Sequence, residues 1–464
     1  MTSSGSLVWV LCRSAGSGAL VAGLATGGGA ALALEPAAVI PALGAGLLLT
    51  AVLANPLLSV GLVVLLSAFS PSFLADRSVT TFGAAANDWI VFLLVLGAFL
   101  RCALSGQIPI RPAVVGPLAI GALLTLPPLA GVPDESAGLK LVVQGLVPFL
   151  VFLVVRYGAF ERTEGELAEI GARLLAAAVG LSIVLTVVAV AVGRPVLSAA
   201  EGGSERFTGS LGSGSYAFFL LTPAAVALAA VTTRRTTGRL VLLAALGTGV
   251  LTTLTRGALI AVAAAVAWAG VAHRRLKGAL VACAVLAAVL FALFQLAPAA
   301  ISRFVPTSSV PEESVRGTWL GREVVWEYAW EEFVVPSPWL GSGLGATAAI
   351  FDERTDLRTG AGAMHNDYLW ILAETGAVGL SIYLLALGAV ARAVWCSRHR
   401  QRHAPEALEI VQRSAALALV AFVVVSIADN AIGNFAHFGV LVFGLAGLAA
   451  RSAWAHDDSV GRVP

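Results

Sequence analysis

The chain has 464 residues, of which 58% are hydrophobic and only 12% are charged. Soluble globular domains carry about 25% charged residues, so this composition excludes an ordinary soluble protein, and a formal net charge of +2 gives no indication of nucleic-acid binding. Apolar runs of about 20 residues recur along the whole length, as in a polytopic membrane protein. The runs are continuous rather than alternating, which favours a helical bundle over a β-barrel.

Fourteen apolar segments are predicted as helices, and the first three are so poorly separated that twelve or thirteen helices remain an alternative. We therefore expect an all-α fold, a polytopic transmembrane bundle of about 12–14 helices with a long, partly helical loop. In chain order the helices are predicted at residues 15–34, 37–54, 56–70, 88–104, 112–130, 138–156, 169–193, 214–233, 238–253, 256–272, 278–297, 365–394, 410–428 and 434–453.

The distribution of arginine and lysine predicts the orientation of the bundle. With the N-terminus in the cytoplasm, the strongest basic clusters, at residues 234–239, 274–277 and 392–413, all fall on the cytoplasmic side, as the positive-inside rule requires. We therefore expect a multi-pass protein of the cytoplasmic (inner) membrane.

One polar segment interrupts the succession of helices. It divides the chain into N-terminal helices (1–297), an extracytoplasmic cap loop (298–364) and C-terminal helices (365–464). Loops longer than about 15 residues are uncommon unless they have a function, and this one is rich in aromatic residues, so we expect a folded cap over the outer face. Pro336–Gly345 is predicted as the stiff start of a flexible turn. Gly321–Val335 is predicted as an amphipathic helix with one face formed by Val325, Trp326, Ala329 and Phe333.

His365 is a titratable residue placed where the polar loop meets a predicted apolar helix. An imidazole can accept a proton near neutral pH, which suits a general base. The alternative is an ordinary helix start, with Asn366 or Asp367 as the cap and aromatic side chains as membrane-interface anchors. On a helical wheel Glu374 points roughly opposite His365, so a carboxylate that orients the imidazole must come from elsewhere in the chain.

Two arginines are predicted on the same outer face. Arg256 stands between Thr255 and Gly257 at the start of a helix, where its guanidinium and the helix N-terminus could bind a phosphate; the alternative is an arginine that snorkels to lipid headgroups. Arg206 lies in a segment rich in glycine and serine before the helix at 214–233, which is either a second phosphate contact or a polar loop.

The two arginines and the histidine together suit a reaction with a diphosphate leaving group and a hydroxyl acceptor. Arginine stabilises the charge that develops on a leaving pyrophosphate, and histidine can take the proton of the acceptor. The four cysteines have no metal-ligand spacing, and the chain holds no HExxH motif or acidic pair typical of a metal site. We therefore expect a site without a metal and without a cofactor.

Three blocks resemble the signature of the O-antigen ligase and polymerase superfamily: Pro338–Gly345, His365–Leu369 and Glu374–Leu380. Over about residues 200–400, further motifs of that superfamily are similar to Gly321-Arg322 with Trp326, to Arg256-Gly257 and to Arg206-Phe207-Thr208-Gly209.

The resemblance implies an all-helical glycosyltransferase of the GT-C type. Such enzymes transfer a glycan from an isoprenoid-diphosphate lipid to an acceptor at the outer face, without a metal or a nucleotide sugar. The resemblance implies that His365 activates the acceptor or touches the diphosphate, and that Arg256 and Arg206 bind phosphate. Arg322, Asn366 and Tyr368 are expected to contact substrate because they stand in family-like motifs.

The expected partners are the lipid-linked glycan donor, membrane lipids, and an acceptor that is a glycan, a lipid or a protein, with no nucleic acid. Many relatives have serine or asparagine where this chain has Thr255 and Ser215, so no role is assigned to those two side chains.

Two other functions remain alternatives. A transporter or flippase for a lipid-linked sugar or a small anion would carry ionisable residues near the bilayer midplane. Here the centres of the predicted helices are almost free of charge, which favours the enzyme. A membrane scaffold whose acidic amphipathic loop helix binds a partner protein is the third interpretation.

Overall fold

The computed structural model describes residues 55–68, 80–81, 84–109, 135–192, 196–199, 205–208, 211, 213–272, 319–347, 364–400 and 405–457. The helices predicted at 15–34, 37–54, 112–130 and 278–297 lie outside the described residues, as does much of the predicted cap loop. The total of 12–14 helices therefore stays a prediction.

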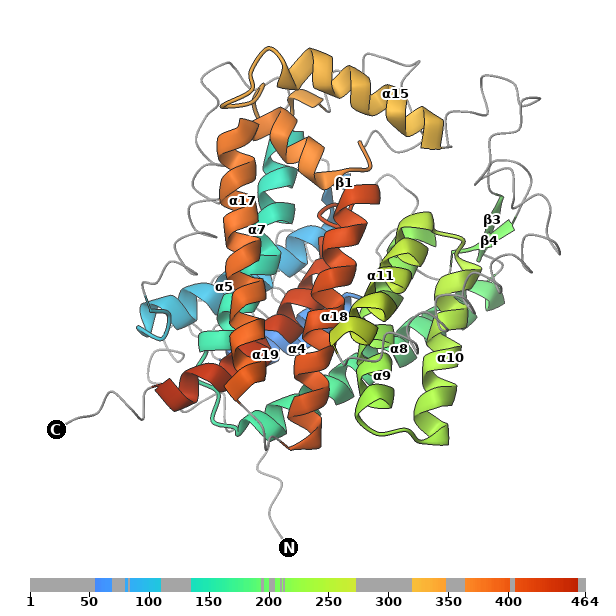
Figure 1. Cartoon of the computed structure of the whole chain (residues 1–464), viewed down its shortest axis with the longest axis vertical. Helices are drawn as coiled ribbons and strands as arrows, with labels where there is room; N and C mark the ends of the chain where they lie inside the picture. Colours follow the sequence, from blue (N-terminus) through green and yellow to red (C-terminus); the bar gives the residue numbers. More distant parts are fainter. Residues whose placement is uncertain are drawn as a thin grey trace, which may run out of the picture.

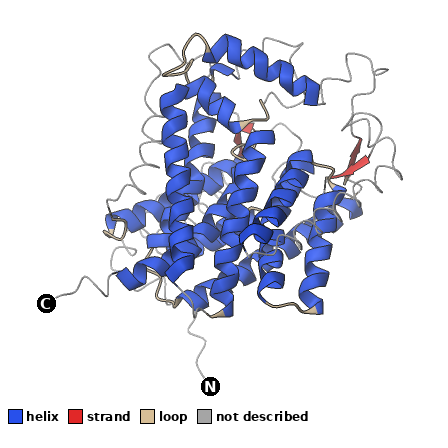
Figure 2. Ribbon diagram, in the orientation of Figure 1, coloured by secondary structure: helices blue, strands red, loops and turns tan. Residues whose placement is uncertain are grey.

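The described part of the chain is a bundle of helices, as Figures 1 and 2 show, and this confirms the all-α prediction. The only β structure in the described ranges is two short antiparallel pairs, β1 (Thr80–Thr81) with β2 (Ala84–Ala85), and β3 (Leu197–Ala199) with β4 (Glu205–Phe207). The α-helices are α4 (Pro56–Leu66), α5 (Ala86–Leu104), α7 (Glu135–Tyr157), α8 (Glu164–Ala191), α9 (Ser213–Thr233), α10 (Thr237–Thr252), α11 (Arg256–Ala272), α15 (Trp319–Ala329), α17 (Asp367–Arg400), α18 (Glu406–Ala428) and α19 (Val440–Asp457), with π-helices η2 (Trp330–Val334) and η3 (Phe435–Gly439).

Local sequence explains where several helices begin. Asn55 accepts hydrogen bonds from the first amides of α4 and is followed by a proline at the first helical position, which suits proline because that amide has no helical partner. Thr163 and Glu166 form a reciprocal capping box at the start of α8. The predicted boundaries agree with the structure to within a few residues in most helices, but α8 begins at Glu164, five residues before the predicted start at 169, because its capping box lies upstream of the apolar run.

Among the residues that the structure describes, four helices are long and apolar enough to cross a membrane: Glu164–Ala191, Gly214–Thr233, Asp367–Ser397 and Glu406–Ala428. Helix α8 exposes a run of large aliphatic side chains, including Val184, Val187 and Val190, as expected for a surface that faces lipid. The chain is a polytopic helical membrane protein.

The core of the bundle is formed by α7, α9, α18 and α19, and aromatic rings fill its centre. Phe149 and Phe443 meet edge to face at 4.9 Å between ring centroids, and Phe422 meets Phe443 at 5.3 Å. A Cβ added to Gly447 of α19 would lie 2.8 Å from the carbonyl oxygen of Phe152. Close approach at a small residue is typical of helix packing in membranes.

A second, smaller hydrophobic core lies at one end of the bundle. There α15 and η2 pack on the first turns of α17, and Figure 1 shows α15 lying across that end of the molecule. Val325, Ala329 and Phe333 are buried in this cluster, as predicted, whereas Trp326, the fourth residue of the predicted apolar face, is only partly buried. We call α15, η2 and the following turn (residues 335–347, the cap turn) the cap.

Helix α17 is not straight, although the sequence predicts one continuous helix. Gly376 has φ 66° and ψ −173°, which breaks the helix into a short first segment under the cap and a long second segment. This backbone conformation is available to glycine at little cost. The kink turns the first segment toward the cap.

Candidate functional site

His365 does not belong to the helix that follows it, which corrects the predicted helix start at residue 365. Helix α17 begins at Asp367, because the side chain of Asn366 accepts a hydrogen bond from the amide of Leu369 at 3.0 Å and caps the helix. His365 has φ 51°, a left-handed conformation that is uncommon for residues other than glycine. Its side chain direction therefore does not follow the helical wheel of α17.

The partner of His365 is a carboxylate from a distant part of the chain. The imidazole Nδ1 lies 3.0 Å from Oδ1 of Asp429, the residue that directly follows α18. The nearer acids have other partners: Asp367 accepts the amide of Ile432 at 2.9 Å, and Glu374 accepts the indole N–H of Trp370 at 2.8 Å. This agrees with the expectation that Glu374 does not orient the imidazole.

Arg322 of the cap reaches the same carboxylate. Its Nη2 lies 3.8 Å from Oδ2 of Asp429, and its Nη1 donates a hydrogen bond to the carbonyl oxygen of Ala428, the last residue of α18. The side chains of Arg322 and Asp429 are each 15% exposed, so the ion pair is largely removed from solvent. The structure thus brings Arg322 and His365 together through a residue that the sequence analysis did not single out.

The environment of Asp429 keeps it ionised. Burial on its own raises the pKa of this carboxyl, but the hydrogen bond and charge of His365, the charge of Arg322 and the amide of Asn430 outweigh burial and lower the pKa below the usual 3.8. An ionised carboxylate can only accept hydrogen bonds, so the imidazole nitrogen that faces it, Nδ1, carries the hydrogen. In the neutral imidazole, Nε2 is then the nitrogen with a free lone pair.

The start of α11 lies against the same carboxylate. A Cβ added to Gly257 would lie 3.1 Å from the Cβ of Asp429 and 3.4 Å from its Oδ2, so a side chain at this position would press on Asp429. Arg256, the first residue of α11, is adjacent to that glycine. Leu254, two residues before α11, has φ 50°. Among the described residues, Leu254 and His365 are the two non-glycine residues with positive φ, and each stands two residues before a helix at this site.

Arg206 lies in β4, where it pairs with Ser198, and the structure describes its backbone but not its side chain. The neighbouring Phe207 packs edge-on against Tyr216 of α9 at 5.3 Å. In the same helix Ser215 donates a hydrogen bond of 2.7 Å to Asn434, in the connection that follows Asp429. This chain of contacts links the β3–β4 pair to the site, and phosphate binding by Arg206 stays a prediction.

Asn366 and Tyr368 have structural contacts of their own. Asn366 caps α17, as described above, and the Tyr368 hydroxyl donates a hydrogen bond of 3.3 Å to the carbonyl oxygen of Val423 in α18. Both contacts fix the start of α17 and therefore the position of His365. Substrate contact by these two residues stays a prediction.

The two glycine-containing blocks at 338–345 and 374–380 bind each other. A Cβ on Gly341 would lie 2.3 Å from the carbonyl carbon of Glu374, and one on Gly376 would lie 2.3 Å from the carbonyl carbon and oxygen of Trp339. Backbone bonds join the segments in both directions, such as Ser342 N to Ala373 O at 2.8 Å and Ala377 N to Pro338 O at 2.8 Å.

The carboxylate of Glu374 completes this junction by accepting the amide of Gly345 at 3.0 Å and the hydroxyl of Thr347. The cap turn, which the sequence predicts as flexible, is instead fixed to the kink of α17 by these bonds.

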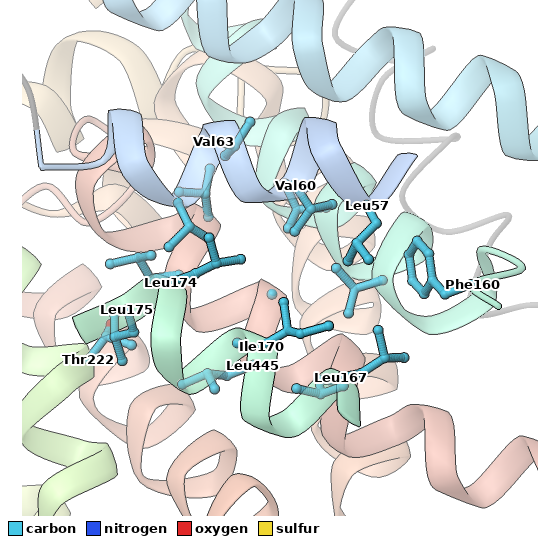
Figure 3. Close-up of a pocket in the computed structure, with 18 residues that line it drawn as sticks. Leu57, Val60, Val63, Phe160, Leu167, Ile170, Leu174, Leu175, Thr222 and Leu445 are labelled. Carbon is cyan, nitrogen blue, oxygen red and sulfur yellow. The ribbon is translucent and has the colours of Figure 1, made fainter. Parts of the chain in front are cut away.

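Cavities in the described part of the bundle include a small one and a larger one. One of about 90 Å³ is lined by α4, α7, α8 and α19 with Thr222, and Figure 3 shows its otherwise apolar side chains, which offer no group for proton transfer. The other, of about 550 Å³, lies between α11, α17 and α18. Its lining is mainly apolar and reaches Val423, whose carbonyl oxygen bonds the hydroxyl of Tyr368.

Asp429 is the residue that reasoning from the sequence missed. Its signal is present but weak: an acid directly after a predicted apolar helix (410–428), in a very short connection to the next one (434–453). Ionisable residues at such positions are usually functional. The sequence alone does not show that this acid lies opposite His365, which is 64 residues away.

Part of the chain matches a known protein family. Residues 240–384 match the family model described as O-antigen ligase, and a comparison with curated proteins finds no match. The matched segment includes Arg256, Arg322 and His365, whereas Arg206 and Asp429 lie outside it. The match confirms the resemblance to the O-antigen ligase and polymerase superfamily, and it supports a role in glycan transfer for the cell envelope.

Proposed function

We propose that this protein transfers a glycan from an isoprenoid-diphosphate lipid to an acceptor hydroxyl at the extracytoplasmic face of the cytoplasmic membrane. The family match supports glycan transfer as the reaction class. The observation that carries the mechanism is the 3.0 Å contact between His365 Nδ1 and Asp429, with Arg322 and the start of α11 beside the same carboxylate.

In this mechanism His365 is the general base. Its Nε2 takes the proton of the acceptor hydroxyl while the oxygen forms a bond to the anomeric carbon of the donor glycan. The bond between that carbon and the diphosphate oxygen breaks, and its electron pair leaves with the diphosphate. Asp429 stabilises the imidazolium that forms and holds the ring in one tautomer, the role of the carboxylate in a hydrolase triad. It is therefore a positioning residue.

The leaving diphosphate needs positive charge that is already in place. Arg256 at the start of α11 and Arg206 in β4 are proposed to bind it, since fixed guanidinium groups stabilise developing phosphate charge. Arg322 already bonds Asp429 and Ala428, so its proposed role is to hold the carboxylate and to add positive potential near the donor. No step of this mechanism needs a metal or a nucleotide.

The apolar cavity of about 550 Å³ between α11, α17 and α18 is proposed to hold part of the isoprenoid chain of the donor. One wall is the helix that begins at Arg256, and the other two helices carry His365 and Asp429 at their ends. A chain in this cavity would therefore run along the three helices whose ends form the site.

The identity of the acceptor distinguishes a ligase from a polymerase. A ligase transfers the glycan to a lipid or protein, and a polymerase transfers it to another lipid-linked glycan. Both use the same donor and the same base.

The deciding experiment follows lipid-linked glycan in a host that lacks this protein, complemented with wild type, His365→Ala or Glu409→Gln. Glu409 pairs with Arg413 at the start of α18, far along the chain from the site, and serves as the control. Carrier-bound glycan should build up on the outer face in the host alone and with His365→Ala, and wild type and the control should clear it. Glycan that stays on the inner face, or full rescue by His365→Ala, would contradict the proposal.

A further inference from the structure

The cap turn carries an exposed apolar tip formed by two neighbouring side chains, Trp339 and Leu340. Trp339 is 71% exposed and Leu340 is 59% exposed, both in the cap turn. Backbone hydrogen bonds at Pro338, Trp339, Gly341 and Ser342 hold this turn in place, so the exposure of the two side chains is not a consequence of a loose loop. Large apolar side chains that are fixed in an exposed position mark a surface that contacts a partner or a membrane.

The tip is continuous with the surface of α17 that faces lipid. The amide of Val378 donates to the carbonyl oxygen of Trp339 at 3.2 Å, so the tip rests on the first turn of the second segment of α17. Below that point the helix exposes apolar side chains at helical spacing along one side: Val378, Leu384, Leu385 and Trp395. The exposed side chains of Trp339 and Leu340 therefore continue this apolar stripe beyond Val378, its first residue.

The length of the second segment places the tip at the membrane boundary. About 20 residues separate Gly376 from Ser397, the end of the candidate span, and at ~1.5 Å per residue they rise roughly 30 Å. That rise matches a hydrocarbon core of about 30 Å. The kink at Gly376 thus lies near one surface of the core, and the residues bonded to it lie at the same depth.

We propose that Trp339 and Leu340 insert into the interfacial region of the bilayer and anchor the cap to the lipid surface. Tryptophan is enriched at this depth because its ring is amphipathic. Glu331 and Glu332 of η2 are exposed and need water, since charged groups are costly in the hydrocarbon region, so the insertion is limited to the tip. The anchor holds the cap, and with it Arg322, at a fixed height above the leaflet. The inference concerns lipid contact and does not depend on the proposed reaction.

Depth-dependent quenching of tryptophan emission tests this anchor in the full-length protein in zwitterionic lipid vesicles. The chain has ten tryptophans, so the signal of Trp339 is taken as the difference between wild type and Trp339→Phe. Lipids brominated on the acyl chain near the headgroup report contact with the bilayer, and iodide in the water reports exposure to solvent. Trp395→Phe supplies a positive control from the same stripe of α17.

The expected result is that brominated lipid removes most of the Trp339 difference emission and iodide removes little. Leu340→Glu should then shift the balance toward iodide, because the added charge draws the tip into water. Quenching by iodide with no effect of brominated lipid would overturn the anchor by placing the tip in water. Protection from both quenchers would also overturn it, because the tip would then be covered by protein.

Discussion

The bundle and the cap are held together by different interactions. Aromatic rings and close helix contacts fill the bundle core, as at Phe149 and Phe443, whereas the cap adds to its small apolar core a buried carboxylate, Glu374, and a set of backbone hydrogen bonds. Lipid offers helices no hydrophobic driving force for association, so shape and polar contacts decide. The bundle is therefore a rigid frame held by side-chain packing. The cap is attached to this frame through a few directional hydrogen bonds.

The candidate site lies where these two regions meet. Arg322 comes from the cap, and His365 stands two residues before the helix segment on which the cap packs. Asp429 and Gly257 come from the bundle. Changes on the bundle side and on the cap side should therefore have distinguishable effects, and the following predictions test that distinction in order of decreasing effect.

The largest effect is expected from Asp429→Asn, on the bundle side. The amide is nearly isosteric but cannot stabilise an imidazolium, so the transfer rate should fall by about 10²–10³-fold, within the range of general-base catalysis. Single-turnover transfer from purified lipid-linked donor measures the effect, and Glu409→Gln is the control. A rate within about twofold of wild type would show that the contact with His365 is structural only.

The next effect is expected from Gly376→Ala, at the junction with the cap. The new Cβ would lie 2.3 Å from the carbonyl group of Trp339, in a backbone conformation that disfavours alanine, and such strain is worth about 1–3 kcal/mol. The thermal unfolding midpoint in detergent should fall, and activity should fall with it. Gly388→Ala in the same helix, with nothing within 4 Å, should lower neither, because alanine is favoured over glycine inside a helix. An equal loss in both variants would show that the junction is not the cause.

A smaller effect is expected from Arg256→Lys, at the start of α11. Lysine keeps the positive charge but cannot make the bidentate contact of a guanidinium. Loss of one hydrogen bond to a charged group costs about 1.5 kcal/mol, so kcat/KM should fall roughly tenfold. Steady-state kinetics with donor varied measure the loss. Arg173→Lys on the exposed face of α8 is the matched control, and equal rates for both variants would exclude Arg256 from the diphosphate site.

A still smaller effect is expected from Ala416→Trp, which adds a large side chain to the apolar cavity between α11, α17 and α18. If the cavity holds the isoprenoid chain, the added indole occupies space that the chain needs, and KM for a long-chain donor should rise by about threefold. A short-chain donor analogue should be affected less. The same KM change for both donors would mean that the cavity does not hold the chain.

The smallest effect is expected in the pH dependence of stability, where wild type is compared with Asp429→Asn. Because the pKa of Asp429 is lowered in the folded protein, its contribution to stability is fully present above its ordinary value of 3.8 and is lost as pH falls through the lowered pKa. The difference in unfolding midpoint between wild type and Asp429→Asn should therefore shrink as the pH falls below about 3.8. A difference that shrinks already between pH 7 and 5 would point to the ionisation of another group.

The sequence predicts the helices well because their signals are local. The apolar runs of α9, α11 and α18 determine the bounds of those helices without any tertiary contact. The capping box of α8 is local as well, but it sets the helix start at Glu164, five residues before the start at 169 that the apolar run predicts. The apolar face of α15 is likewise periodic in the sequence, so its burial was expected.

The kink at Gly376 and the pairing of His365 with Asp429 could not be predicted in the same way. Around Gly376 the helical pattern continues on both sides, and only the approach of Trp339 requires a positive φ there. His365 and Asp429 lie on separate elements, and their proximity depends on how α17 and α18 pack. A pairing of this kind is a property of the folded chain, and helical periodicity gives no information about it.

The left-handed backbone at His365 has a consequence for the evolution and engineering of this protein. An L-residue with a φ of 51° is less favourable than glycine, by about 1 kcal/mol or more. Replacement by glycine at this position would remove the imidazole and relieve the backbone at once. Directed evolution for heat resistance, without a test for activity, should therefore accumulate glycine at position 365, in a trade-off between stability and activity.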